Sequence, residues 1–361
     1  MHERIERRTR RASAGRWLAL FLGFTAIGWP ALASEDHTNN HTRPDGHAPI
    51  GVMGDHTHAA GEVMFSYRWM RMRMDGNRSS TRHDSIPSVI GTPGRPGRFL
   101  VVPTDMDMEM HMVGAMYAPH DRITLMGMLP FVRLSMDHLR RDGRRFRTNN
   151  ERIGDVRAGA LITLFDDEMH HLHLNAGVSI PTGNIRRKDT LPAPLNRGRL
   201  PYPMQIGSGT WDLMPGATYT GRVSWLSWGL QGIATIRTGR NSLGYRLGNR
   251  IDGTAWAAVP WTDWFSTSAR VGYSAFGNVV GRDDLLNPNL VPTADPNRRG
   301  GRRLELFAGV NLAIPLGPLG THRFAVEGGF PAYEWLNGPQ LETDWSITVG
   351  WQKAFKGLPA L

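Results

Sequence analysis

The chain has 361 residues, of which 40% are hydrophobic and 20% charged, and it contains no cysteine. This length suits either two ordinary domains or one large all-β domain. Without cysteine, a disulfide scaffold, a thiolate metal site and an iron–sulfur cluster are excluded. Beyond residue 35 no apolar run reaches the roughly 20 residues of a membrane-spanning helix, which excludes a helical membrane protein. A soluble protein and a β-barrel remain.

The N-terminus has the three parts of a secretory signal. Six arginines lie within the first 16 residues, an apolar stretch runs from Trp17 to Trp29, and the small residues Ala31 and Ala33 precede Ser34. This order is typical of a cleaved signal peptide, whereas an amphipathic helix does not change so abruptly from basic to apolar. Removal of residues 1–33 takes away six Arg and two Glu, which lowers the formal charge from +10 to +6. The mature chain is therefore still basic.

Alternation of apolar residues with polar or small ones dominates the sequence from residue 61 onward. Successive side chains of a strand point to opposite faces, so this period of two predicts strands with one apolar face. Twelve such segments lie near residues 61–74, 105–118, 122–136, 154–165, 171–181, 209–220, 226–237, 250–261, 264–277, 303–314, 322–330 and 341–355. Most reach the roughly 9 to 11 residues that a strand needs to cross hydrocarbon, whereas ordinary sheet strands have about 5 to 6.

The connections between these segments alternate in length. Those after even-numbered segments are short, as in 119–121 and 262–263, and those after odd-numbered segments are mostly long, as in 75–104 and 182–208. Outer-membrane barrels show this alternation, with short periplasmic turns and long extracellular loops. Amphipathic aromatic rings prefer the headgroup level. Such residues gather beside the short turns: Tyr117, Phe165, Tyr219, Trp225, Trp228, Trp261, Trp264 and Phe324.

The predicted fold class is all-β: a transmembrane antiparallel β-barrel of about 12 strands in the bacterial outer membrane. We expect a signal peptide over 1–33, a flexible His-rich periplasmic tail over 34–60 and the barrel over 61–361. The even number of strands returns both ends of the barrel to the periplasm.

The basic character comes almost wholly from arginine, and much of it falls in the odd-numbered loops. These loops hold Arg140, Arg141, Arg144, Arg145 and Arg147, Arg186, Arg187, Arg197 and Arg199, and further arginines near 240–250 and 282–299. If the loops face outward, their guanidinium groups meet the phosphates of lipopolysaccharide, which Arg binds in a bidentate manner. A nucleic-acid partner is not expected, because few aromatic residues are interleaved with the basic ones. The oligomeric state stays open.

Thirteen of the 17 methionines lie between residues 53 and 136. In the segment 61–74 the large apolar residues occupy odd positions, which places Met70, Met72 and Met74 toward the lumen. In the segment 122–136 the same argument sends Met126 and Met128 inward. Two of three adjacent strands are thus expected to line the pore with thioethers.

The segment 105–118 has two possible orientations. Methionines at even positions form one face, and the other face holds Asp105, Asp107, Glu109 and His111. Charge at bilayer depth is costly, so we expect the carboxylates to face the lumen and the methionines to face lipid. The opposite orientation stays open. Other polar residues expected to line the lumen and set its charge selectivity are Asp155, Arg157, Arg303, Glu305 and Glu327.

Thioether and imidazole ligands suit copper, particularly Cu(I). The Asp55-His56-Thr57-His58 run places several donors close together in the predicted tail. The candidate metal ligands are therefore Asp55, His56, His58, Met70, Met72 and Met74, and copper is the one cofactor that the sequence suggests. The alternative is a solvated tail with methionine used as adaptable packing, because nothing here has the fixed spacing of a known closed site.

Several stretches resemble a family of bacterial outer-membrane transporters related to the meta-pathway phenol-degradation proteins. The resemblance rests on residues 48–56 (APIGVMGDH), 103–106 (PTDM), 177–183 (GVSIPTG) and 200–205 (LPYPMQ), and it covers most of the mature chain. It implies a β-barrel and a transport role, and it brings neither catalytic residues nor a defined substrate.

The expected function is a channel or transporter that lets small molecules or ions diffuse passively through a polar lumen. A copper-binding or copper-efflux accessory barrel is one alternative, and a non-conducting structural barrel is another. We find no nucleophile elbow, no P-loop and no H-E-x-x-H motif, so an enzyme is not expected. A barrel lipase with Ser, His and Asn on adjacent strands stays open, because such a triad is defined by geometry rather than by order in the chain.

Overall fold

A computed structural model describes residues 43–92, 94–192, 197–317 and 320–356. The predicted signal peptide and residues 34–42 of the predicted tail lie outside the described residues. No helix in the described part of the chain is both long and apolar enough to cross a membrane.

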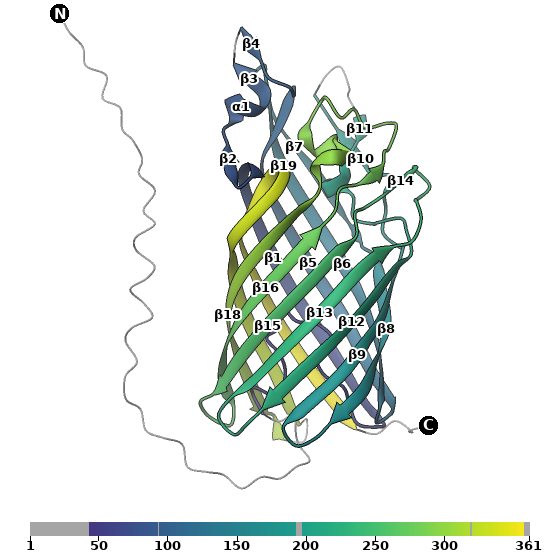
Figure 1. The fold of residues 1–361 in the computed structure, drawn as a ribbon, viewed down its shortest axis with the longest axis vertical. Coiled ribbons are helices and arrows are strands. Elements are labelled where there is room, and N and C mark those ends of the chain that lie inside the picture. The colour runs from purple at the N-terminus through teal and green to yellow at the C-terminus, as the bar shows by residue number, and fades with distance from the viewer. Residues whose placement is uncertain (1–42, 93, 193–196, 318–319, 357–361) are drawn as a thin grey trace, which may run out of the picture. The chain divides into compact units, whose positions relative to one another are not determined.

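The described chain forms a closed antiparallel β-barrel (Figure 1). Each wall strand pairs with the next along the chain, except that β7 and β8 both pair with β6, and β19 pairs with β1 to close the ring. The wall strands are β1 (Glu62–Ser80), β5 (Val101–His120), β6 (Ile123–Arg140), β7 (Arg145–Ile153), β8 (Val156–Asp166), β9 (His170–Ile180), β12 (Asp212–Arg222), β13 (Ser227–Arg237), β15 (Arg250–Pro260), β16 (Phe265–Phe276), β18 (Gly301–Pro315) and β19 (Thr321–Lys356).

Strand β19 crosses the wall twice. Its first part pairs with β18, where Thr321 lies opposite Pro315, and its last part pairs with β1, where Lys356 lies opposite Glu62. Leu336 has partners in both neighbours, which marks the point of reversal. In the described residues, the twelve wall strands therefore make twelve crossings, because β7 and β8 together form one crossing against β6, whereas β19 forms two. The predicted barrel of about 12 strands is confirmed.

The period of two in the sequence produces two chemically different faces of the wall. On β8, Ile162 and Leu164 are exposed on the outside, whereas Leu161 is buried inside. Outward residues must contact hydrocarbon, so they are apolar over the height of the bilayer. The short turns lie at one end, at the bottom of Figure 1. There Trp225, Trp261 and Trp264 are exposed, as an aromatic belt at the headgroup level requires.

The wall is taller on one side than the sequence analysis expects. Strands β1, β5 and β6 have 19, 20 and 18 residues, about twice the length needed to cross hydrocarbon. Residues 137–153, which the segment boundaries leave as a loop, continue β6 and form β7. The loop assignment is therefore wrong for Arg140, Arg145 and Arg147, which lie in strands.

Short elements in the loops cover the other end of the barrel, at the top of Figure 1. They are β2 (Arg82–Asp84), α1 (Ile86–Ile90), β3 (Gly91–Thr92), β4 (Arg95–Pro96), β10 (Lys188–Thr190), β11 (Arg197–Arg199), η2 (Tyr202–Met204), β14 (Tyr245–Arg246), β17 (Val280–Gly281), η3 (Pro292–Ala294) and η4 (Pro296–Arg298).

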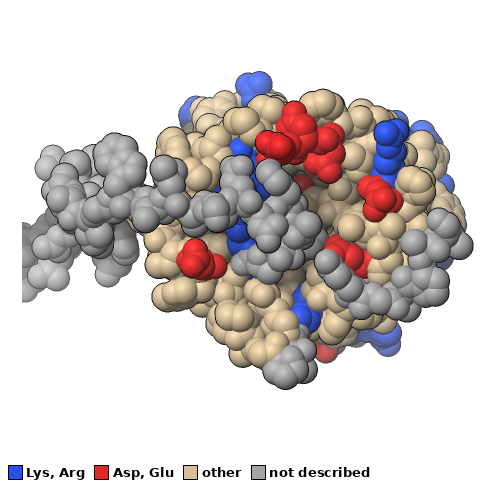
Figure 2. Space-filling view, turned by 90° about the horizontal axis from the view of Figure 1, so that it is seen from below, with Lys and Arg blue, Asp and Glu red and all other residues tan. Residues whose placement is uncertain are grey.

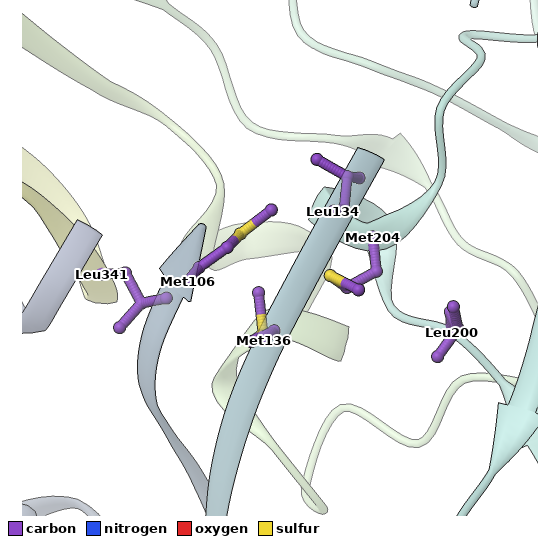
Figure 3. Close-up of a cluster of buried hydrophobic side chains, with 6 residues drawn as sticks. All are labelled: Met106, Leu134, Met136, Leu200, Met204 and Leu341. Carbon is purple, nitrogen blue, oxygen red and sulfur yellow. The ribbon is translucent and has the colours of Figure 1, made fainter. Parts of the chain in front are cut away.

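The loop that contains η2 turns into the barrel and forms a buried cluster with the wall. Leu200 and Met204 of this loop pack against inward side chains of β5, β6 and β19 (Figure 3). Asn150 donates a hydrogen bond from its amide to the Met204 carbonyl (2.7 Å), which fixes the loop to β7. Buried apolar contact and a satisfied backbone carbonyl together hold this loop in the outer mouth.

The segment expected to be a flexible periplasmic tail lies inside the barrel over residues 43–60. Ala48, Ile50, Val52 and His58 are all buried. The expectation is wrong for these residues because they find both apolar contact and hydrogen-bond partners on the inner wall. We call residues 43–61 the lumen segment.

Candidate functional site in the barrel lumen

The lumen segment is held by side chains rather than by strand pairing. Among the described residues, its backbone–backbone hydrogen bonds to the wall lie at its end, where Gly61 donates to Ala118 (2.8 Å) and Glu62 of β1 donates to Ala59 (3.0 Å). Side chains from six wall strands bond its backbone: Ser266 to Pro44, Ser227 to Asp45, Arg323 to Ala48, Glu327 to Gly51, Arg68 to Val52, Gln231 to Met53, His173 and Asn175 to Gly54, and Thr124 to His58. These bonds satisfy backbone groups that would otherwise be buried without partners.

Two glycines let the lumen segment approach the wall closely. A Cβ on Gly51 would lie 2.2 Å from Oε2 of Glu327, because the Gly51 amide donates to that carboxylate (2.9 Å). Gly54 has a φ of +62°, a conformation that favours glycine, and its carbonyl accepts bonds from the wall. Both glycines belong to the stretch that carries the family resemblance, so that stretch has a structural role in the lumen.

The Glu327 carboxylate that receives Gly51 is itself part of a buried ion pair. Arg270 donates to both of its oxygens, at 2.7 and 2.9 Å, and the two side chains are only 10% and 2% exposed. The Arg270 guanidinium also lies 3.7 Å above the centre of the Phe307 ring. A bidentate, charge-assisted pair of this kind fixes the position of both side chains.

Methionine side chains cover the inner face of three adjacent strands. Two rows of paired residues cross the three strands. One row is Met64, Met116 and Met126, and the other is Met74, Met106 and Met136. The methionines of this face are Met64, Met70, Met72 and Met74 on β1, Met106, Met108, Met110, Met112 and Met116 on β5, and Met126, Met128 and Met136 on β6. The methionines of β1 and β6 face the lumen as predicted, and those of β5, between them, face it too.

The orientation expected for the strand 105–118 is wrong. Met106, Met112 and Met116 of β5 are buried inside, whereas Val113 on the alternate face is 56% exposed. Asp105, Asp107, Glu109 and His111 share that outer face, so they do not line the lumen. They lie in the outer half of β5, on the tall side of the wall, and the apolar positions lie nearer the short turns.

Basic and aromatic side chains of the neighbouring strands neutralise these outward carboxylates. Arg73 pairs with Asp105 (2.9 Å) and Asp107 (2.7 Å), and the Trp69 indole donates to Glu109 (2.7 Å). His111 bonds the Tyr67 hydroxyl (2.7 Å). The cost of charge at bilayer depth does not apply, because strands of this length carry their outer halves above the hydrocarbon.

The remaining predicted lumen residues lie on or near the inner wall. Arg157 of β8 borders an internal cavity, and Arg303 of β18 pairs with Glu334 (2.6 Å). Glu305 lies on the same face of β18 as Arg303. Glu327 holds the lumen segment, as described above. Asp155, between β7 and β8, accepts hydrogen bonds from Gly183 and Ser208 and so anchors the loop that follows β9.

An internal cavity of about 80 Å³ lies between the lumen segment and the wall. Four methionines from three parts of the chain border it, together with Asn175, Arg157 and small residues of β8 and β9. The four are Met53 of the lumen segment, Met126 and Met128 of β6, and Met214 of β12. Thioether sulfur is a soft ligand, so this cavity offers the donor type that Cu(I) prefers.

A larger vestibule of about 660 Å³ opens at the end with the short turns. Figure 2 looks at this end and shows acidic side chains gathered around the central hollow. The carboxylates and imidazoles that border it are Asp45, His47, Asp55, His56, His58, Glu62, Asp121, Asp166, Asp167, Glu168, His170 and His171. Arg222 also borders the vestibule, but carboxylates outnumber basic side chains there. A concave surface with an excess of one sign of charge raises the local concentration of the opposite ions.

One group of potential metal ligands lies in this vestibule. His47, Asp55 and His56 each offer a ligand atom, and these atoms all lie within 4.8 Å of one another. Burial would raise the pKa of the Asp55 carboxyl, but the charge and hydrogen bond of His56 and the charge of Arg323 hold that pKa below its usual range. The carboxylate is therefore available as an anionic ligand.

The structure brings together only part of the predicted metal set. Asp55 and His56 share the group, and His58 lies next to it, with its ring centre 4.9 Å from that of His56. Met70, Met72 and Met74 lie on the inner face of β1, and Met74 packs against the buried cluster at the opposite end. His47 is absent from the predicted ligand set, because nothing in its sequence spacing indicates that the segment folds back on itself.

The wall residues that hold the lumen segment were also missed. Arg68, His173, Asn175, Gln231, Arg270 and Arg323 are polar residues at inward positions of their strands. The alternation of the strands predicts that such residues face the lumen. It carries no information about what they bind there.

Solved structures share this architecture. An outer-membrane channel from Pseudomonas putida F1 matches with a TM-score of 0.60 and 14% identity, over 84% of this chain and 99% of that chain. This chain has the outer-membrane β-barrel fold. The KdgM porin (TM-score 0.36, 9% identity, 81% of this chain and 99% of that one) and a FadL homologue from Pseudomonas aeruginosa (0.38, 12%, 82% and 89%) are similar at lower scores.

No family model matches the barrel sequence, and no curated protein does. The resemblance to the transporters related to the meta-pathway phenol-degradation proteins therefore stays a prediction. The comparison with known structures shows that the chain shares the fold of a bacterial outer-membrane channel, and the solute stays unidentified.

Proposed function

We propose that this protein is an outer-membrane channel that carries small solutes by passive diffusion, with the lumen segment narrowing its bore. The observation that carries the proposal is a segment of chain inside a closed barrel that is attached by side chains and shares no strand ladder with the wall. Such a segment can move without loss of barrel pairing. The polar wall and the open vestibule then provide a path for a hydrated solute.

The charge of the vestibule defines which solutes the channel favours. Asp121, Asp166, Asp167 and Glu168 lie in or beside the short turns, and all four border the vestibule. Several arginines of the inner wall are engaged with carboxylates or carbonyls, as in the Arg270–Glu327 and Arg303–Glu334 pairs. We therefore expect cations and neutral molecules to enter from this end more readily than anions.

Uptake into proteoliposomes tests this proposal. The protein is expected to admit small organic cations faster than anions of equal size, and the preference should weaken at high salt, because screening shortens the reach of exposed charges. Replacement of Asp166, Asp167 and Glu168 by Asn, Asn and Gln should weaken the preference while leaving neutral-sugar uptake unchanged. Equal uptake of both charges by the unchanged protein would contradict the assignment.

A second candidate function is the passage or binding of soft metal ions. The specific observation in its favour is the continuous methionine face of β1, β5 and β6 together with the cavity that four methionines border. Thioethers bind Cu(I) and do not bind hard cations well. The alternative explanation is that the methionines only pack the barrel interior, where their flexible side chains fill irregular space.

Replacing Met53, Met126, Met128 and Met214 by leucine separates these two explanations. Leucine keeps the volume of methionine at a cost below about 1.5 kcal/mol per site, so the barrel should stay folded. We expect the variant to lose the tightest Ag(I) site, measured by titration with Ag(I) as a redox-stable probe for Cu(I). A matched variant with leucine at Met136, Met169 and Met204 should keep it. Unchanged Ag(I) binding in the quadruple variant would favour packing.

The outward charged face of the tall wall supports a contact with the outer leaflet. Arg71, Arg133 and Arg147 are each about half exposed at the side chain or more, and each pairs with a carboxylate on a neighbouring strand. Guanidinium groups at this height meet lipid phosphates, for which they compete with the carboxylates. We include lipopolysaccharide among the partners on this basis.

A further inference from the structure

We infer that His47, Asp55 and His56 form a binding site for a borderline divalent transition-metal cation such as Cu²⁺ or Zn²⁺. The bound ion would stabilise the folded-back conformation of the lumen segment. The inference is independent of the proposed transport, since it concerns an ion bound to the segment rather than a solute that passes it.

The spacing of the ligand atoms suits a single ion. Nδ1 of His47 lies 3.2 Å from Nδ1 of His56, and Oδ1 of Asp55 lies 3.0 Å from the same His56 nitrogen. Ligand atoms about 2.0 to 2.2 Å from a tetrahedral ion are about 3.3 Å apart. The two imidazole nitrogens face each other, so an ion between them would replace the proton that they share as a hydrogen bond. The two ring planes are inclined at 79°, and the ring centres lie 4.1 Å apart.

The surrounding groups hold the three ligands in place. The second oxygen of Asp55 accepts a hydrogen bond from the Ala48 amide (2.8 Å), and the Ala48 carbonyl accepts one from Arg323 of β19 (2.6 Å). Metal-binding side chains in proteins are oriented by outer partners of this kind. The ligands themselves are largely buried, with the His56 side chain 12% and the Asp55 side chain 4% exposed.

The vestibule supplies access to the three ligands. His47, Asp55 and His56 all border it, and its carboxylate rim attracts cations from the end with the short turns. Two imidazoles and one carboxylate suit Zn²⁺, Cu²⁺ and Ni²⁺, with Cu²⁺ bound more tightly than Zn²⁺, whereas Mg²⁺ prefers a set of oxygen ligands. Magnesium should therefore not compete.

The ion would join two ends of a loop that runs through Ile50 and Gly51. His47 and His56 are nine positions apart, and the loop between them carries the contacts to Arg323, Glu327 and Arg68. Closing a loop of chain removes conformational freedom from its open form. Bound metal should thus hold the lumen segment against the wall.

Titration calorimetry with Cu²⁺, Zn²⁺ and Mg²⁺ tests the inference on tag-free full-length protein purified from membranes in detergent. His37 and His41 are replaced by Gln in every sample, so that imidazoles earlier in the chain do not contribute. We expect one Cu²⁺ or Zn²⁺ per chain with micromolar or tighter affinity, and no heat from Mg²⁺. His47→Gln and Asp55→Asn should each weaken binding at least tenfold, and His120→Gln, an exposed histidine at the same end of the barrel, should leave it unchanged.

Electron paramagnetic resonance of the Cu²⁺ complex gives a readout that does not depend on affinity. The parent protein should show hyperfine splitting from two imidazole nitrogens, and His56→Gln should show one. Unchanged binding in both His47→Gln and Asp55→Asn, or a parent spectrum without nitrogen ligands, would overturn the inference. A folded barrel changes its mobility on gel electrophoresis when the sample is heated, and a variant without this change has not folded. In that case the spectrum of the parent protein alone tests the inference. Failure of solute uptake would leave this result untouched.

Discussion

Deletion of residues 44–57 is expected to raise the single-channel conductance of the barrel by about tenfold or more, because it empties a narrow bore. The lumen segment contacts six strands around the ring, so it occupies the bore rather than one wall. Its removal breaks side-chain hydrogen bonds and leaves the strand ladder intact. Planar-bilayer recording of the two proteins measures the difference directly.

A point substitution should produce a weaker form of the same result. Alanine at Gly51 places a methyl group 2.2 Å from the Glu327 carboxylate, so the segment must shift away from β19. Alanine at Gly232 of β13, where an added Cβ meets nothing within 4 Å, is the matched control and should conduct like the parent. An unchanged conductance in the deletion protein would mean that the outer loops close the barrel, and would favour a non-conducting structural role.

Glu327→Ala is expected to lower the free energy of unfolding by about 3–5 kcal/mol, because it leaves the Arg270 guanidinium buried without its partner. The substitution also removes the acceptor of the Gly51 amide, so the lumen segment loses a contact to the wall. Urea unfolding of the barrel in lipid vesicles, followed by tryptophan fluorescence, measures the loss.

Asp284→Ala is the control for this measurement. Its pair with Arg282 lies in an outer loop, and both side chains are more than two-thirds exposed, so its removal should have no measurable effect on unfolding. A loss in Glu327→Ala no larger than that of the control would show that solvent in the lumen screens the Arg270–Glu327 pair.

The barrel itself could be predicted because lipid imposes a local rule on the sequence. Every crossing strand must alternate, and every second turn must be short, so Ile162, Leu164 and the aromatic residues beside the turns indicate the fold without knowledge of any contact. The number of crossings followed from counting such segments. The extension of β6 into β7 did not, since Arg145 and Arg147 stand above the membrane, where the rule no longer applies.

The interior was predicted less well, for two physical reasons. The segment 43–60 has no period and makes its contacts with residues far away in the chain, as in the bond between Gly51 and Glu327, so its position in the lumen has no local signal. Asp105, Asp107 and Glu109 were assigned to the lumen because charge was assumed to lie at bilayer depth. Their outward orientation depends on the height of the wall, which exceeds one crossing.

The side-chain attachment of the lumen segment has a consequence for how the protein is assembled. The segment leads directly into β1, one of the two strands that close the ring, yet it contributes no strand pairing to that seam. The cylinder can therefore be completed first and filled afterwards from the periplasmic opening. Insertion into the bilayer and entry of the lumen segment into the barrel would then be separate events. A newly inserted barrel would conduct solutes through an open bore until the segment has entered it.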